Sequence, residues 1–313
     1  MLKVALVGVG GISGTHIPAW DSMQDTELVA LCDIRPERME KYQDKRHYEN
    51  VDELLEKEDI DILDICLPTF LHTEVALKAL NKGINVLCEK PLSLDTDEIS
   101  LLYDTAEKNG VKIMAAQVLR FWYEYEVLKN IYETEKYGKL ISGSMSRLGV
   151  RPETSWNNWM LDESLSGLVP FDLHIHDCDF LYYAFGNPVK TTTYRKKRPE
   201  QDYLEVVYEY KDFFVTADAS WYAAPYPFRA TFRFQFEKAV VANENGKLTV
   251  YECGGKISDL SETAEDSGVL GLPKSDAYAN EIRYFTDCVI ANKNPDKVTK
   301  DQLREVIGLL RSL

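Results

Sequence analysis

The chain has 313 residues, of which 45% are hydrophobic and 28% charged, a composition typical of a globular protein with room for two domains. Its formal net charge of −15 predicts repulsion from nucleic acid and from anionic membrane surfaces. No apolar run approaches the roughly 18 residues that a membrane span requires, and we expect no signal peptide before the first strand. The six cysteines contain no C-x-x-C pair, so we expect reduced thiols in a cytoplasmic protein.

The first 16 residues predict a strand, a glycine-rich turn and the start of a helix. The run Val4–Val7 has no polar face, which is typical of a strand covered on both sides in a parallel sheet. Gly8 permits a tight turn, and Gly10 lets a pyrophosphate approach the backbone. The helix that opens near Ile12 directs its free N–H groups toward that phosphate. Ser13 takes the place of the third glycine in the G-x-G-x-x-G fingerprint.

An acidic residue follows the second expected strand. The apolar run Glu27–Cys32 ends at Asp33, about 20 residues beyond the glycine turn. A carboxylate here accepts hydrogen bonds from the adenosine ribose and repels a 2′-phosphate, which favours NAD. Arg35 and Arg38 follow closely and could pair with a 2′-phosphate, so NADP stays open. The simpler alternative is a glycine turn without a dinucleotide, but the strand–helix–strand context favours the nucleotide.

The two halves of the chain have different periodicities. As far as about Ala116, short apolar strands alternate with amphipathic helices, which predicts a doubly wound parallel sheet of the Rossmann type. The expected strands are Lys3–Val7, Glu27–Cys32, Ile60–Leu67, Asn85–Cys88 and Lys112–Ala115, and the expected helices are Val51–Lys57, Thr73–Asn81 and Thr96–Lys108. Farther along, Tyr203–Tyr210 and Arg229–Phe236 alternate in character, which predicts a large open, mostly antiparallel sheet in an α+β domain.

We therefore expect an N-terminal nucleotide-binding domain over residues 1–119 and a C-terminal domain over residues 120–313. A helix over Glu124–Lys136 opens the second domain. Two helices, Ala277–Ile290 and Lys300–Leu313, close the chain. The pattern leaves open whether these last helices pack back on the first domain.

Two later turns carry residues that are unusual for plain connections. Pro68 ends one strand, Thr69 can cap the next helix, and His72 lies one turn into that helix. His72 is either a surface or capping residue or lines the cofactor site. In Glu89-Lys90-Pro91, the proline holds Lys90 extended at the strand tip. A lysine there is either solvated, as most are, or works as an acid/base that bonds a substrate hydroxyl.

The segment after Pro170 predicts a helix on which Asp172 and His176 are four residues apart and share a face. A carboxylate that orients an imidazole makes it a better general base. His174 and Cys178 share the other face and are interpreted as packing residues. We expect no metal here, because the two histidines are about 200° apart on a helix and cannot converge on one ion.

Together these motifs resemble the Gfo/Idh/MocA oxidoreductase family, the glucose-fructose oxidoreductase and inositol dehydrogenase group. The matching segments run in the family's order: Gly8–His16 for G-x-G-x-x-[GS]-x-x-H, Cys66–His72 for C-L-P-T-x-x-H, Glu89–Pro91 for E-K-P, then Arg120-Phe121, and Asp172 with His176 for D-x-x-x-H. The resemblance implies hydride transfer between a nicotinamide cofactor and a secondary alcohol of a sugar, cyclitol or related polyol.

The resemblance also implies roles for single residues. Lys90 would bind and polarise the reacting hydroxyl, His176 would be the general acid/base, and Asp172 its partner. The cofactor would contact Gly8, Gly10, Gly11, Ile12, Ser13, Asp33, Arg35, Leu67, Pro68, Thr69, His72, Glu89 and Lys90. The substrate would contact Lys90, Arg120, Asp172 and His176, and Trp156 is added because aromatic rings suit sugars. The Lys90–Pro91 bond is often cis in this family, and the C-terminal sheet often forms a homodimer or homotetramer interface.

Two other functions compete with a dehydrogenase. One is a non-catalytic sensor that keeps the dinucleotide fold without turnover, and the other is a redox-neutral NAD-dependent glycosidase that oxidises its substrate only transiently. Retention of Lys90, Asp172 and His176 favours an enzyme over a sensor. Release of reduced cofactor separates a dehydrogenase from a glycosidase. His174 stands where many family members have glycine, so we expect a differently shaped pocket behind this helix.

Overall fold

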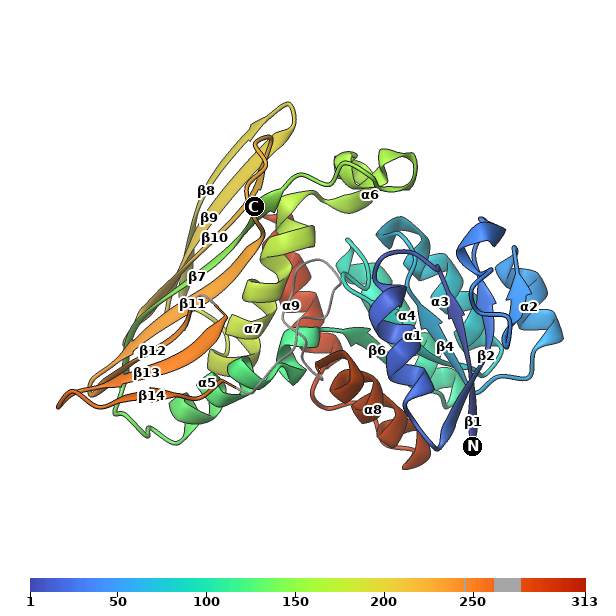
Figure 1. Cartoon of the computed structure of the whole chain (residues 1–313), viewed down its shortest axis with the longest axis horizontal. Helices are drawn as coiled ribbons and strands as arrows, with labels where there is room; N and C mark the ends of the chain where they lie inside the picture. Colours follow the sequence, from blue (N-terminus) through green and yellow to red (C-terminus); the bar gives the residue numbers. More distant parts are fainter. Residues whose placement is uncertain (245, 262–276) are drawn as a thin grey trace. The chain divides into compact units, whose positions relative to one another are not determined.

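A computed structural model of the chain describes residues 1–244, 246–261 and 277–313 (Figure 1). Contacts between these residues divide the chain into two compact units. Unit 1 contains Met1–Val118 and the described part of Asp276–Gly308. Unit 2 contains the described part of Leu119–Ser275 together with Leu309–Leu313. Each unit is built around its own sheet.

The described part of unit 1 holds a six-stranded parallel sheet in the order β3-β2-β1-β4-β5-β6. Its strands are β1 (Leu2–Val7), β2 (Thr26–Cys32), β3 (Arg46–Tyr48), β4 (Ile62–Ile65), β5 (Asn85–Glu89) and β6 (Ile113–Ala116). The order reverses between β1 and β4, and open sheets of this kind bind ligands beside the carboxyl ends of the strands at such a point. The predicted doubly wound sheet is therefore confirmed.

Helices flank this sheet as the sequence signals require. They are α1 (Ser13–Asp21), α2 (Val51–Lys57), α3 (His72–Asn81), α4 (Thr96–Asn109), α8 (Ala277–Ile290) and α9 (Lys300–Arg311), the last belonging to unit 1 as far as Gly308. Asn50 caps α2 by accepting the N–H of Asp52 at 2.7 Å. Right-handed crossovers that leave β1 and β4 in opposite directions place α1 and α3 on opposite faces of the sheet. Helix α8 packs against α1.

One strand of unit 1 differs from the prediction by more than one residue at its ends, and one strand was not predicted. The strand expected over Ile60–Leu67 is shorter, because β4 spans Ile62–Ile65 and the chain turns at Cys66. Strand β3 was not predicted. It is a polar strand of three residues at the sheet edge, Arg46–Tyr48, and therefore shows no apolar run.

The described part of unit 2 is organised around an eight-stranded sheet in the order β14-β13-β12-β11-β7-β10-β9-β8 (Figure 1). Strands β7 and β10 pair in parallel, and the other neighbours pair antiparallel. The strands are β7 (Leu140–Val150), β8 (Lys190–Arg198), β9 (Gln201–Glu209), β10 (Phe214–Tyr222), β11 (Arg229–Phe236), β12 (Ala239–Glu244), β13 (Lys247–Glu252) and β14 (Ile257–Asp259). The expected mostly antiparallel sheet is confirmed.

Aromatic side chains join one face of this sheet to two helices, α5 (Tyr123–Glu133) and α7 (Ile175–Phe185). Tyr125 of α5 contacts Phe180 of α7 edge-on at 4.9 Å and Phe232 of β11 at 5.2 Å between ring centres. Phe234 of β11 is fully buried and occupies the space beside Gly143, where a Cβ would lie 2.4 Å from its ring. The alternation predicted for β11 therefore points its phenylalanines into the core.

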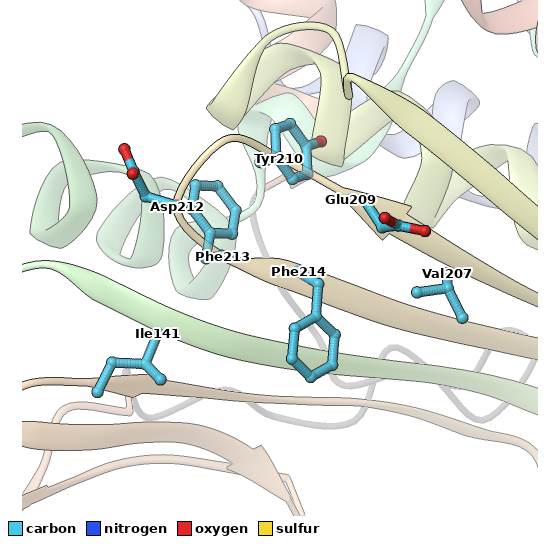
Figure 2. A pocket seen from close by; sticks show the side chains of 7 residues that line it. All are labelled: Ile141, Val207, Glu209, Tyr210, Asp212, Phe213 and Phe214. Carbon is cyan, nitrogen blue, oxygen red and sulfur yellow. The ribbon is translucent and has the colours of Figure 1, made fainter.

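The other face of the sheet carries a hollow near the turn between β9 and β10. Figure 2 shows side chains from β7, β9 and β10 around it. Ile141 and Phe214 are 43% and 47% exposed there, and Val207 lies beside them. Glu209 and Asp212 add negative charge to the same rim. This face thus combines exposed apolar and acidic groups.

Short helical segments join β6 to α5 and β7 to α7. They are η3 (Val118–Phe121), η4 (Trp156–Leu161), α6 (Glu163–Ser166) and a π-helical turn, η5 (Pro170–His174), which runs directly into α7. Along the described stretches of the chain, no helix is both long and apolar enough to traverse a bilayer.

Candidate active site

The glycine-rich turn after β1 is shaped by its contact with β4. Gly8 has φ +94°, and a Cβ there would lie 2.5 Å from the carbonyl oxygen of Cys66. Only glycine fits this position without strain. A Cβ on Gly10 or Gly11 would meet no atom within 4 Å, so both glycines face open space. Gly8 therefore holds the turn against the sheet, while the next two glycines leave room for a ligand.

Helix α1 begins at Ser13 directly after this turn. Its N-cap residue, Ile12, makes no side-chain capping bond, and the first turn contains no acidic residue. The hydroxyl of Ser13 donates instead to the carbonyl of Gly10 at 2.8 Å, and Ser13 is 2% exposed. The substitution of the third glycine thus gives the turn an internal hydrogen bond. The N–H groups of Gly14 and Thr15 already donate to the carbonyls of Gly11 and Ile12, at 3.1 and 3.0 Å, so it is the positive end of the α1 dipole that suits a phosphate.

Asp33 lies at the end of β2 and connects it to the glycine turn. Its Oδ2 accepts the backbone N–H of Val9 at 2.8 Å. Its Oδ1 accepts both the backbone N–H and the Nε–H of Arg35, at 2.9 and 3.2 Å. Asp33 is 7% exposed. The side chain of Arg35 therefore bonds to Asp33, the acid that we predict to bind the adenosine ribose.

The turn after β4 is closed by a buried histidine. Leu67 and Pro68 are half-buried, Thr69 is buried, and His72 is 1% exposed. The two ring nitrogens of His72 lie 2.7 Å from the carbonyl oxygen of Leu67 and 2.9 Å from that of Pro91. Burial lowers the pKa of His72 below 6.5, although both carbonyls act in the opposite direction. His72 thus ties two neighbouring turns together and is no surface residue.

The tripeptide Glu89-Lys90-Pro91 ends β5. Glu89 is 7% exposed, and its Oε2 accepts the backbone N–H of Lys90 at 3.1 Å. Lys90 is half-buried, and the Lys90–Pro91 peptide bond is cis. The structure therefore places Lys90 directly after the carboxyl end of β5, where the sequence predicts it.

The second oxygen of Glu89 bonds to a residue for which we predicted no role. Nε2 of His16 lies 2.9 Å from Glu89 Oε1, and its Nδ1 lies 2.8 Å from Asp64 Oδ2. Trp20 Nε1–H donates to the same Asp64 oxygen at 2.7 Å. His16 and Asp64 are both fully buried. Burial alone would lower the pKa of His16, but Asp64 and then Cys66 hold it well above 6.5.

This cluster also has the residue types of a metal site. Among the described residues, ligand atoms of His16, Asp64 and Cys66 lie within 4.8 Å of one another. Both nitrogens of His16, however, are already at hydrogen-bonding distance from carboxylate oxygens. Burial raises the pKa of the Cys66 thiol to about 12, which disfavours a thiolate ligand. The geometry suits shared protons better than an ion.

The candidate acid/base residues of unit 2 lie on η5 and α7. Asp172 belongs to η5, His176 to the first turn of α7, and both are half-buried. Trp221 of β10 donates its Nε1–H to Asp172 Oδ2 at 3.2 Å. A π-helical turn has more residues per turn than an α-helix, so it brings positions four apart close to one face. Such turns are frequent at functional sites.

Two buried ion pairs link α7 to η3 and to β7. Arg120 bonds Asp179 through two nitrogens, at 2.6 and 2.8 Å, and neither side chain is more than 1% exposed. Arg147 of β7 bonds Asp177 at 2.8 and 3.2 Å. The guanidinium of Arg120, predicted to contact the substrate, is thus committed to α7. Trp156 of η4 is half-buried.

His174 is a packing residue, as we interpreted it from the sequence. It is fully buried, and its Nε2 lies 2.8 Å from the hydroxyl of Tyr208, whose ring stacks on it. Burial, with a smaller contribution from Arg147, lowers the pKa of His174 to about 3. His174 is therefore a neutral core residue and Cys178, also fully buried, shares that core.

Two models of known protein families match this chain, one in each unit. Residues 2–117 match a family model described as the Gfo/Idh/MocA oxidoreductase family, NAD-binding Rossmann fold. Residues 125–242 match the model of the Gfo/Idh/MocA C-terminal domain, so the two models together cover about three quarters of the chain. The chain belongs to the Gfo/Idh/MocA oxidoreductase family.

Two relatives of the chain are named as dehydrogenases. The chain is 31% identical over 205 residues to glucose-6-phosphate 3-dehydrogenase of Bacillus subtilis, a match that covers 63% of this chain and 57% of that protein. It is 26% identical over 194 residues to myo-inositol 2-dehydrogenase of Thermotoga maritima, covering 60% and 56%. The chain thus spans little more than half the length of these curated relatives.

A solved structure of the same architecture covers nearly the whole chain. It is an oxidoreductase from Agrobacterium radiobacter in complex with NAD⁺, L-tartaric acid and magnesium. The TM-score is 0.82 at 18% identity, and the match covers 99% of this chain and 94% of that chain. At this identity the likeness shows the shared fold.

The Gfo/Idh/MocA chain fits the cofactor that its N-terminal fold is named for. Open space beside Gly10 and Gly11, together with the uncapped start of α1, suits a pyrophosphate. Asp33 holds a carboxylate at the ribose end of that turn. When bound, NAD supplies the carbon that accepts or donates hydride.

Sequence reasoning missed Asp64 and the role of His16. His16 lies in the quoted turn motif, but it was read only as part of the pattern. Asp64 could have been found, because it is an acid in the apolar strand β4 and is fully buried. A buried acid requires a partner, and that partner had to be another buried polar residue.

Proposed function

We propose that this protein is an NAD-dependent dehydrogenase that transfers hydride between the nicotinamide and a secondary alcohol of a sugar, cyclitol or related polyol. The observation that carries the proposal is Lys90, held at the carboxyl end of β5 in an NAD-binding fold by the bond between Glu89 and its backbone N–H. The named activities of the relatives in the two curated matches support the same substrate class.

Each acid/base residue has one task in this proposal. Lys90 donates a hydrogen bond to the reacting hydroxyl and stabilises the alkoxide that forms. His176 accepts the hydroxyl proton, while the hydride leaves the same carbon for the cofactor. Asp172, steadied by the bond from Trp221, orients the imidazole and favours its charged form. Reduction of a ketone runs these steps in reverse.

The proposed cofactor site keeps the predicted residues of unit 1, with their roles refined by the geometry. Gly10 and Gly11 admit the pyrophosphate and α1 binds it. Asp33 favours NAD over NADP, because a 2′-phosphate would meet its carboxylate. The other members, which shape this edge of the sheet, are Gly8, Ile12, Ser13, Arg35, Leu67, Pro68, Thr69, His72 and Glu89. Arg120, which also supports α7, and Trp156 are kept as proposed substrate contacts.

We further propose two domains, residues 1–119 for the nucleotide and residues 120–313 for substrate and assembly, with α8 and α9 as far as Gly308 packing back on the first domain, and a cytoplasmic location. The outer face of the eight-stranded sheet is the proposed homodimer or homotetramer interface. Exposed Ile141 and Phe214 around the hollow in Figure 2 support it, because a second sheet would cover them. We propose no binding to nucleic acid or membranes, given the net charge of −15.

The test is a screen of sugars, sugar phosphates and cyclitols with NAD⁺ that follows NADH absorbance. Lys90→Ala and His176→Ala should each lower turnover of the substrate found at least about a hundredfold. Lys108→Ala and His47→Gln are matched controls, since His47 is exposed and Lys108 lies in the last turn of α4. Tightly retained NAD without net NADH formation would instead indicate a redox-neutral reaction.

A further inference from the structure

His16 lies between two carboxylates that can only accept hydrogen bonds when ionised. Its Nδ1 is 2.8 Å from Asp64 Oδ2 and its Nε2 is 2.9 Å from Glu89 Oε1. A neutral imidazole has one N–H and can satisfy only one of these contacts. Both bonds together therefore require an imidazolium, or a proton on one of the carboxylates.

The surroundings favour the imidazolium. Asp64 of strand β4 and Cys66, which follows that strand, face the ring. Glu89 and Cys88 of strand β5 lie beside it as well, and the ring of Tyr278 on α8 is 5.9 Å away. Asp64 also accepts the Trp20 N–H, and the Cys66 thiol lies 3.7 Å from its other oxygen. Hydrogen bonds to an ionised carboxylate stabilise its charged form. Asp64 is thus arranged as an anion and needs a buried cation.

The chain of contacts continues from His16 to the proposed reaction centre. Glu89 uses one oxygen for His16 and the other for the backbone N–H of Lys90. All three groups, Asp64, His16 and Glu89, come from the ends of β4, α1 and β5 and are at most 7% exposed. A rotation of Glu89 away from His16 would also remove the acceptor of the Lys90 N–H.

We propose that His16 is a positioning residue that carries a fixed positive charge between Asp64 and Glu89 and thereby holds Lys90 in place for reaction. The inference rests on the proposed dehydrogenase function. His16 touches neither cofactor nor substrate in this proposal. It acts through Glu89, whose other carboxylate oxygen accepts the Lys90 backbone N–H.

The direct test is nitrogen-15 NMR of protein labelled at histidine. At pH 8 we expect one ring with both nitrogens protonated and with two slowly exchanging ring protons, and His16→Gln should remove these signals. Asp64→Asn should lower the pH at which this ring loses its proton. A neutral tautomer at pH 8 in the folded wild type would overturn the proposal, whatever the enzyme activity.

The kinetic test separates positioning from mere structural support. His16→Gln should lower kcat about ten- to hundredfold, because a small misplacement of Lys90 is costly, while KM for NAD changes less than about threefold. His47→Gln is the control. A normal kcat, or a KM for NAD that rises as much as kcat falls, would contradict the proposal.

Two further variants cover the case in which His16→Gln does not fold. Glu89→Gln leaves α1 unchanged and should reproduce the same fall in kcat. Where both single variants fold, the double variant should be no worse than either, because both residues act through one contact. Full additivity would contradict the proposal. If the wild type forms no NADH from any alcohol, the proposed function fails, and the NMR result still decides the state of His16.

Discussion

His16 in unit 1 and His174 in unit 2 are equally buried, yet their environments favour a charged ring for His16 and a neutral ring for His174. His16 faces the carboxylates of Asp64 and Glu89, which hold its pKa well above 6.5. His174 faces the hydroxyl of Tyr208, and burial lowers its pKa to about 3. Both side chains are 0% exposed. Burial alone therefore does not decide the charge of a histidine.

The difference lies in which cation balances the buried acids. In unit 2, Arg120 and Arg147 pair with Asp179 and Asp177, so no carboxylate remains for His174 among the contacts described. In unit 1, no arginine is bonded to Asp64 in the described structure, and the histidine fills that place. Unit 1 thus uses a titratable group near its proposed reaction centre, and unit 2 uses permanent charges behind α7.

The largest effect is expected from removing an acid that balances an arginine. Asp177→Asn leaves Arg147 buried without its counter-charge and should lower the free energy of unfolding by about 3 to 5 kcal/mol at pH 7. Urea unfolding measures it. The control is Glu209→Gln, which breaks the exposed pair with Lys190 and should cost at most about 1 kcal/mol. Similar losses in both variants would refute the assignment of Arg147 as a buried structural cation.

A smaller effect concerns acid stability in unit 2. The folded pKa of His174, about 3, lies below its unfolded value near 6.5, so the unfolded chain binds a proton that the folded chain refuses. This group therefore costs stability as pH falls below about 6.5, by ~1.4 kcal/mol per pH unit until pH 3. His174→Gln should show a shallower loss in urea unfolding between pH 6 and 4. An unchanged slope would mean that His174 is already charged when folded.

The opposite pH dependence is expected in unit 1. Because the folded pKa of His16 lies above 6.5, its stabilising contribution is fully present below about pH 6.5 and is lost as pH rises through the raised value. His16→Gln should be less stable than wild type by about 2 kcal/mol at pH 6, the scale of charged hydrogen bonds. Thermal unfolding at pH 6 and above pH 9 should show the gap narrowing. A stability difference between wild type and His16→Gln that grows at high pH would contradict a raised pKa of His16.

Elements with a single strong signal were predictable from the sequence. Val51–Lys57, Arg229–Phe236 and Ala277–Ile290 have the boundaries expected from their periodicity and caps. Gly8 was predictable because a turn between β1 and α1 needs a residue with positive φ. The polar edge strand β3 was not, since three residues without an apolar run resemble a loop.

The site residues were harder to assign than the fold. Lys90 and Glu89 could be placed from a strand end followed by proline, but Arg120 could not, because its partner Asp179 is 59 residues away in sequence. The same holds for His16, whose partners are 48 and 73 residues away. Buried pairs of this kind depend on which strands become neighbours, and local patterns do not contain that information.

The central claim is that hydride moves between an alcohol carbon and NAD with Lys90 and His176 acting on the hydroxyl. The most direct measurement uses a substrate from the screen carrying deuterium at the reacting carbon and follows the isotope by mass spectrometry. The account predicts deuterium in the released reduced cofactor, and at least about a hundredfold less in Lys90→Ala and His176→Ala. Product formation by wild type without deuterium in the cofactor, or undiminished transfer in both variants, would contradict it.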